Sequence, residues 1–170
     1  MTRGPSTLPS GGRPLGEEER RALQAEMERI VDQSHLFRSL DAPGRERLLA
    51  SGYVCSFPAG TTIIQQDEAG FTMYLVLEGR VRVETRTSTG TVQLAELGRG
   101  ACIGEVAVLT GTERTATVVA LTDVDCVAFA QHRIQRILDD YPRVRELLER
   151  LVDARARHTI ERIVGGGEPG

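Results

Sequence analysis

Short β-prone segments separated by glycine-containing turns fill the middle of the chain and constrain the fold more than any other feature. Five of them follow one another closely, at residues 53–57, 61–65, 71–78, 80–87 and 91–97. In the fourth, Val81 and Val83 alternate with Arg82 and Glu84, which is typical of a strand with one wet and one dry face. Two further strands are expected at 114–121 and 124–129. Short, regularly spaced strands with such turns predict an antiparallel sandwich or barrel.

Helical periodicity flanks this β-region on both sides. From Glu17, apolar residues recur at three- and four-residue steps, and the acidic first turn suits the helix dipole. A second helix is expected from Ala42 to Ala50, with Asp41 as its N-cap. After Ala130 the helical period returns, and Pro142 divides this region into two helices. The chain therefore combines helices with a separate β-region.

The pattern as a whole predicts one domain with a short tail at each end. Its fold class is α+β: an antiparallel β jelly-roll barrel of about eight strands, flanked by N-terminal helices and a C-terminal helical pair. Residues 1–16 hold several Gly and Pro and little hydrophobicity, so they are expected to be disordered. The expected boundaries are a disordered tail at 1–16, helices at 17–50, the barrel at 53–130, the C-terminal helices at 131–164 and a flexible tail at 165–170.

Composition narrows the classes of function. The formal net charge of −3 argues against broad electrostatic attraction to nucleic acid or to an anionic membrane. No apolar run reaches the length of a membrane span and no signal peptide is evident, so we expect a cytoplasmic protein with no membrane partner. The cysteines, Cys55, Cys102 and Cys126, match neither a metal site nor a disulfide framework. They are expected to pack as small hydrophobes.

The segment between the fifth and sixth strands carries the chemistry. Gly104 to Leu109 is expected to form one helical turn, and the unpaired N–H groups at a helix start suit an anion such as phosphate. Gly104 lacks the Cβ that would block close approach of a ligand. Arg114 brings a guanidinium that matches two phosphate oxygens, and Glu105 offers acceptors that suit a ribose hydroxyl. The alternative interpretation is a surface Glu105–Arg114 pair that braces the loop.

The run Gly104-Glu105-Val106-Ala107-Val108-Leu109, followed after a short turn by Arg114-Thr115-Ala116-Thr117-Val118, resembles the phosphate-binding cassette of the cyclic-nucleotide-binding domain family. This is the family of the catabolite activator protein and of kinase regulatory subunits. The resemblance covers roughly residues 35–163. Residues 58–60, 75–81 and 97–100 fall where the family has its barrel turns.

The resemblance implies a role for each cassette residue. It assigns Glu105 to the ribose 2′-hydroxyl and Arg114 to the cyclic phosphate, and it places Thr115 where a hydroxyl residue touches the phosphate or the base. Backbone amides complete the phosphate shell. The implied ligand-binding set is Gly104, Glu105, Val106, Ala107, Arg114, Thr115 and Ala116, with Leu94 and Cys102 in the pocket wall. Ala101 and Cys102 depart from the family pattern, which often has an acidic and an aromatic residue there.

The resemblance also reaches the last helix. Arg155 and Thr159 fall on positions that approach the nucleotide, so they are expected to act as a lid, with Thr159 toward the purine. Being four residues apart, they share one helical face. The alternative for Arg155 is a solvated basic face. The apolar stripe of Val144, Leu148 and Leu151 either pairs two subunits or packs onto the chain's own barrel.

These observations predict a sensor rather than an enzyme. The expected strands carry no His, as a metal-dependent barrel enzyme would need, and no Ser–His or Cys–His arrangement is evident. We expect cyclic AMP or cyclic GMP as ligand, with no metal and no cofactor. The C-terminal helix would signal to an effector protein in trans, without direct DNA binding, because only a short segment follows the last helix. The alternative is a related fold that serves as an interaction platform and no longer binds nucleotide.

Overall fold

The computed structural model describes residues 12–30 and 34–150. The helices are α1 (Glu17–Ile30), α2 (His35–Ser39), α3 (Ala42–Ala50), α4 (Glu105–Thr110) and α5 (Gln131–Asp139). The strands are β1 (Arg13–Pro14), β2 (Tyr53–Phe57), β3 (Thr62–Ile64), β4 (Thr72–Glu78), β5 (Val81–Thr87), β6 (Gly90–Leu97), β7 (Cys102–Ile103), β8 (Thr117–Ala120) and β9 (Val124–Ala130). Residues 142–150 form a further helical segment, named here the 142–150 helix.

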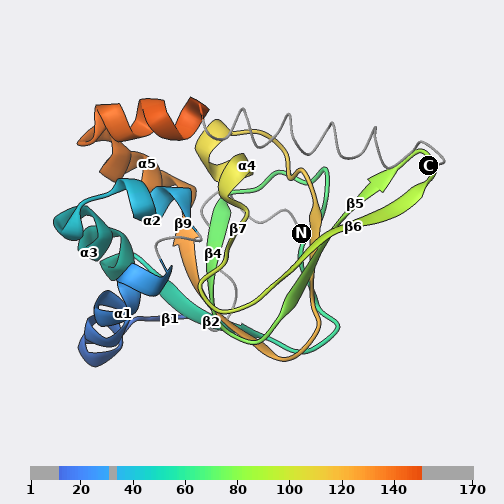
Figure 1. Cartoon of the computed structure of the whole chain (residues 1–170), viewed down its shortest axis with the longest axis horizontal. Helices are drawn as coiled ribbons and strands as arrows, with labels where there is room; N and C mark the ends of the chain where they lie inside the picture. The colour runs from blue at the N-terminus through green and yellow to red at the C-terminus, as the bar shows by residue number, and fades with distance from the viewer. Residues whose placement is uncertain (1–11, 31–33, 151–170) are drawn as a thin grey trace.

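The strands form two antiparallel sheets that make the predicted jelly roll. One sheet has the order β1-β2-β9-β4-β7 and the other the order β3-β8-β5-β6. Helices α1, α2, α3 and α5 and the 142–150 helix gather at one end of the molecule, and the β5–β6 hairpin extends at the opposite end (Figure 1). The α+β class and the jelly-roll architecture are therefore confirmed.

Side-chain alternation along β4 divides the apolar core into two layers. Tyr74 and Val76 belong to an inner cluster of residues from both sheets. Met73 and Leu75, on the opposite face of the strand, belong to an outer cluster that contains side chains of the helices. This period of two follows from strand geometry. The five-stranded sheet is thus buried on both faces along β4, and the inner and the outer cluster both take residues from this one strand.

The helices are fixed to this outer layer and to one another. Phe37 of α2 packs edge-on against Phe129 of β9, with ring centroids 5.7 Å apart. Asp41 caps α3 by accepting from the Gly44 amide at 2.9 Å, as predicted, and it also accepts from the Tyr141 hydroxyl at 2.8 Å. These two donors hold the pKa of Asp41 below its usual range. The chain just before the 142–150 helix is thereby tied to the start of α3.

The expected N-terminal tail is too long. Residues 12–16 are ordered: Arg13 and Pro14 pair with Val54 and Tyr53 of β2, and Leu15 is only 5% exposed. Burial of one apolar side chain and a strand pairing outweigh the Gly- and Pro-rich composition that suggested disorder. Two other short elements, α2 with five residues and β7 with two, were not expected, because segments this short contain too few residues to establish a periodic pattern.

All three cysteines are buried and free, in agreement with the expectation that they pack. The strand register places Cys55 of β2 directly opposite Cys126 of β9. Burial raises the pKa of Cys55 to about 11 and that of Cys126 to about 12. Both thiols are therefore protonated at neutral pH and behave as apolar core groups. Among the described helices, none combines the length and apolarity that a membrane crossing requires.

The apolar stripe of the 142–150 helix packs onto the chain's own core. Leu148 is 1% exposed and belongs to the outer cluster, with the partly buried Val144 beside it. Leu147, its neighbour in sequence, is 44% exposed. Leu151, the third residue of the predicted stripe, lies outside the described residues. Of the two interpretations of Val144 and Leu148, intramolecular packing therefore holds.

This packing predicts that Leu148→Ala lowers the free energy of unfolding by about 2–5 kcal/mol, because it removes buried methyl groups and leaves a cavity. Leu147→Ala is the matched control, with an expected loss of less than about 1 kcal/mol at an exposed position. Urea denaturation of both variants measures the difference. An equal and small loss of unfolding free energy in the two variants would contradict the observed packing of Leu148 in the core.

Candidate functional site

The candidate site lies where α4 and the loop after it meet the start of β4. Ile103 of β7 pairs with Tyr74 of β4, so the chain enters α4 from the edge of the five-stranded sheet. After α4, Gly111 ends the helix with φ 71°, and the chain returns toward β8. Figure 1 shows α4 beside β4 and β7 at the rim of the barrel. The helical turn predicted for Gly104 to Leu109 is confirmed in this position.

Gly104 is required at the entrance to α4 for two reasons. Its φ of 81° and ψ of 11° lie in the left-handed region, where a Cβ is strained. A Cβ there would also stand 3.0 Å from the Thr72 carbonyl oxygen and would collide with Nη1 of Arg114. The first amides of α4 have no acceptor within their own helix, as at any helix start. The backbone therefore presents donors next to a guanidinium.

Arg114 is a buried cation at this point. The residue is 8% exposed, its Nη2 donates to the Thr72 carbonyl at 2.6 Å, and its Nη1 donates to the Gly104 carbonyl at 3.2 Å. Burial lowers the pKa of its guanidinium, and the neighbouring Tyr74 and Glu68 act in the opposite direction. Within residues 12–30 and 34–150, no carboxylate forms an ion pair with it. Its charge is thus compensated inside the described structure mainly by neutral carbonyl groups.

Glu105 is the first residue of α4 and is 3% exposed. A carboxylate at this end of a helix is favoured by the dipole. The carbonyl of Gly104 accepts a hydrogen bond from the Arg114 guanidinium, and this places the adjoining Glu105 backbone next to the guanidinium. The alternative of a surface ion pair is wrong, since both residues are buried and no ion pair joins them within the described structure.

The other predicted cassette residues differ in their surroundings. Ala107 is buried, Val106 and Ala116 are half-buried, and Thr115 is exposed. The carbonyl of Thr115 accepts from the hydroxyl of Thr85, a buried residue of β5, at 3.4 Å. The Thr115 side chain is therefore at the surface while its backbone is tied to the barrel.

The two predicted pocket-wall residues have different outcomes. Leu94 is half-buried on β6 and is the extra residue of a bulge, because Glu84 pairs with Gln93 and Val83 with Ala95. Cys102 belongs to the outer core cluster, on the helix side of the sheet. Its neighbour Ile103 belongs to the inner cluster instead. We therefore correct the prediction for Cys102: strand alternation turns it away from the inside of the barrel.

A loop far from the cassette in sequence completes the surroundings of Arg114. The Arg114 amide donates to the Glu68 carbonyl at 2.8 Å, and the Asp67 amide donates to the Arg114 carbonyl at 2.9 Å. Ala69 and Glu113 form an antiparallel bridge. This pairing with the loop explains why β8 begins at Thr117 and not at Arg114 as expected. Sequence reasoning identified residues 67–70 only as a turn, since no local pattern shows which distant segment a turn will pair with.

The predicted lid residues, Arg155 and Thr159, lie outside the described residues. Among the residues that are described, no cluster of His, Cys, Asp and Glu could hold a metal ion.

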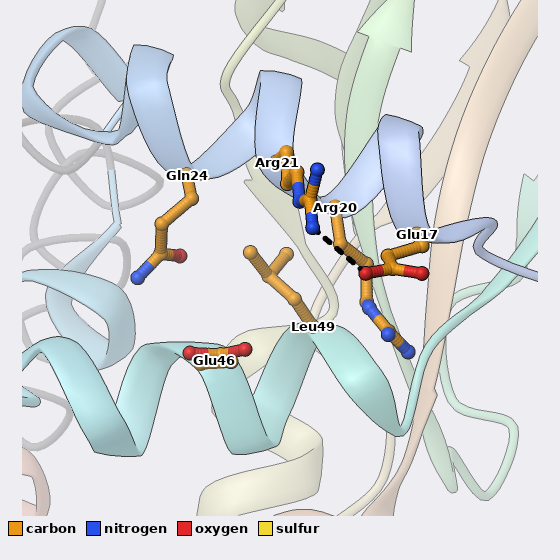
Figure 2. A pocket seen from close by; sticks show the side chains of 6 residues that line it. All are labelled: Glu17, Arg20, Arg21, Gln24, Glu46 and Leu49. Carbon is orange, nitrogen blue, oxygen red and sulfur yellow. Dashed lines mark hydrogen bonds and ion pairs between the residues drawn. The ribbon is translucent and has the colours of Figure 1, made fainter.

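A separate groove of about 250 Å³ lies between α1 and α3. Figure 2 shows its lining, with Arg21 paired to Glu17 at 2.9 Å. The lining residues are Glu17, Arg20, Arg21, Gln24, Glu46 and Leu49. This groove includes no residue of α4 or of the loop around Arg114, and its charges of both signs sit near the surface. Unlike the site around Arg114, this groove has no buried cation in its lining.

Known proteins share this fold. The sequence model described as "Cyclic nucleotide-binding domain" matches residues 54–141. The chain is similar to the catabolite activator protein of Thermus thermophilus, with 29% identity and a TM-score of 0.65, covering 76% of this chain and 62% of that one. It is also similar to the regulatory domain of Toxoplasma gondii PKA, solved with cAMP, with 24% identity and a TM-score of 0.66, covering 75% and 47%.

A relative among larger proteins is the lysophospholipase NTE1 of Chaetomium globosum. It is 33% identical over 104 residues, which are 61% of this chain but 7% of the enzyme. The similarity therefore concerns one part of that protein. Because the family's sequence model matches just over half of the chain, and the two-sheet fold agrees with it, the chain belongs to the cyclic nucleotide-binding domain family.

Proposed function

We propose that this protein is a regulatory domain that binds a cyclic nucleotide, cyclic AMP or cyclic GMP, at α4 and Arg114. The observation that carries the proposal is the buried Arg114 guanidinium beside the first amides of α4, with no ion-pairing carboxylate among the described residues. A buried charge is costly unless an opposite charge approaches it. A cyclic phosphate carries one negative charge, which one guanidinium neutralises.

Each residue of the site has a distinct role in this proposal. The two carbonyl acceptors, on Thr72 and Gly104, fix the plane of the Arg114 fork. A guanidinium has five N–H donors, so donors remain for two phosphate oxygens. Amides at the start of α4 and at Ala116 complete the phosphate shell. Glu105 accepts from the ribose 2′-hydroxyl, and Thr115 contacts the phosphate or the base.

The proposed output is a displacement of the helices that follow the barrel. The carbonyl of Val108 in α4 accepts from the side-chain amides of Gln131 and Gln135 in α5, each at 3.1 Å. Arg145 of the 142–150 helix in turn donates to the Gln135 carbonyl at 2.8 Å and to the Gln135 side-chain oxygen. A continuous set of hydrogen bonds thus joins α4 to the 142–150 helix. Gln135 is the residue that contacts both.

We further propose that this displacement is read by an effector protein in trans, without direct contact to DNA. A ligand shifts such an equilibrium only by its different affinity for the two positions of the helices. Leu148 is already buried in the domain's own core, so a homodimer formed through this helix would have to use another face. We propose no catalytic activity for the domain, and the lid role of Arg155 and Thr159 remains part of the proposal.

The second candidate function is an interaction platform that has lost nucleotide binding. The exposed Thr115 and the Ala101 and Cys102 departures from the family pattern favour it. An interaction platform does not explain why the guanidinium of Arg114 is buried, so we place this function second.

The proposal predicts saturable binding of cyclic AMP or cyclic GMP and its loss in Arg114→Ala. Charge-assisted hydrogen bonds contribute about 1.5–3 kcal/mol each, so the variant should bind at least about tenfold more weakly. Isothermal titration calorimetry with both nucleotides measures the affinity and identifies the base. The matched control is Arg133→Ala, which removes an exposed arginine of α5 and should leave the affinity unchanged.

The corresponding nucleosides, adenosine and guanosine, test the contribution of the phosphate and should bind far more weakly. Urea denaturation establishes that the Arg114→Ala protein is folded before it is titrated. If folded, unmodified protein gives no heat with either nucleotide, the sensor proposal is wrong and the platform replaces it.

The set of hydrogen bonds through Gln135 predicts that Gln135→Leu separates binding from the response of the helix. Nucleotide affinity should change by less than about threefold, since Gln135 does not contact the ligand site, whereas the ligand-dependent change in amide hydrogen exchange at residues 142–150 should disappear. Gln131→Leu is the control, because Gln131 donates to the same Val108 carbonyl but has no described bond to the 142–150 helix. A normal exchange response in Gln135→Leu would rule out this route.

A further inference from the structure

Gly70 lies directly against the side chain of Arg114. A Cβ added at Gly70 would overlap Nε, Cδ and Cζ of Arg114, that is, the root of the guanidinium and not its flexible far end. The φ of Gly70 is not among the positive values, so the backbone there accepts any residue. The requirement for glycine at this position is therefore one of space, and the space is taken by Arg114.

The backbone cannot easily move to relieve that overlap. The segment before Gly70 is joined to the segment around Arg114 by the Arg114 amide to Glu68, by the Asp67 amide to Arg114, and by the bridge between Ala69 and Glu113. These contacts hold the Gly70 Cα at a fixed distance from the Arg114 backbone. Within that frame, a side chain at position 70 and the observed position of the guanidinium exclude each other.

Two glycines thus border different parts of one side chain. Gly104 meets the guanidinium at Nη1, and Gly70 meets it at Nε and Cδ. Other described glycines serve different needs: a Cβ at Gly52 would meet Val127 and Phe129 in the core, and one at Gly79 would meet the backbone of Asp123. Gly70 and Gly104 are thus two positions at which a Cβ would stand against Arg114.

We propose that Gly70 is a positioning residue for the phosphate site. By lacking a side chain it admits the Arg114 guanidinium to the place where it donates to the carbonyls of Thr72 and Gly104 and faces the bound phosphate. A methyl group at position 70 displaces the guanidinium from these acceptors. This inference rests on the proposed function, because it assigns Gly70 to the same anion site, and it names a residue that does not itself touch the ligand.

A double-mutant cycle tests it. Gly70→Ala should weaken cyclic-nucleotide binding by about tenfold or more, since the displaced guanidinium loses its charge-assisted bonds to the phosphate. The Gly70→Ala/Arg114→Ala protein should bind no more weakly than Arg114→Ala alone, because the overlap no longer exists. Gly98→Ala is the matched control: its Cβ would lie 3.7 Å from the nearest atom, the Gly79 carbonyl oxygen, and its affinity should equal that of the unmodified protein.

The outcomes separate this inference from the proposed function. If the unmodified protein binds and Gly70→Ala binds equally well, the positioning role is wrong and the sensor proposal stands. If the unmodified protein does not bind, both are overturned. Thermal unfolding covers the case in which Gly70→Ala does not fold. If the double variant folds again, the overlap with Arg114 is supported. If neither protein folds, Gly70 is required for the fold itself and the inference is overturned.

Discussion

The structure around the site depends on one buried guanidinium. Removing a cation from water is expensive, and carbonyl groups repay only part of the cost. Arg114 nevertheless lies at 8% exposure, with Thr72 and Gly104 as its acceptors. Accommodating it requires a glycine at 104 in a left-handed conformation and a second glycine at 70. The loop at 67–69 then closes over its backbone. The local geometry is explained by the need to hold a positive charge in one orientation.

The alternation along β4 connects this charge to the rest of the molecule. Thr72, at the start of the strand, gives its carbonyl to Arg114, while Met73 and Leu75 face the helices and Tyr74 and Val76 face the other sheet. Val108 of α4 is buried in the helix-side cluster and is also the carbonyl acceptor for α5. In the proposed function, a displacement of α4 therefore reaches α5 directly through the Val108 carbonyl.

Sequence alone predicted the features that depend on local chemistry. The Asp41-capped helix and the strand at 53–57 have the predicted bounds, because a capping residue and a β-prone run are both visible in neighbouring residues of the sequence. The cassette helix came from residue types in a specific order, whereas the burial of Arg114 was not predicted and is a finding of the structure. What could not be predicted depends on distant partners: the pairing of Arg13 with β2, the outward face of Cys102, and the contact between Gly70 and Arg114. The sequence of a turn such as 67–70 does not indicate which distant segment the turn will contact.

The tie between Tyr141 and Asp41 has a mechanical consequence. Together with the ion pair of Arg47 and Asp140 at 2.8 Å, it fastens the chain at the foot of the 142–150 helix to α3. The foot of the helix is thus a fixed point, from which the helix extends by about 1.5 Å with each residue. Arg145, which donates to the Gln135 carbonyl, lies only a few residues from this fixed point. In the proposed function, a rotation about this fixed point moves the later residues of the helix further than the earlier ones, and this is the displacement that an effector protein would detect.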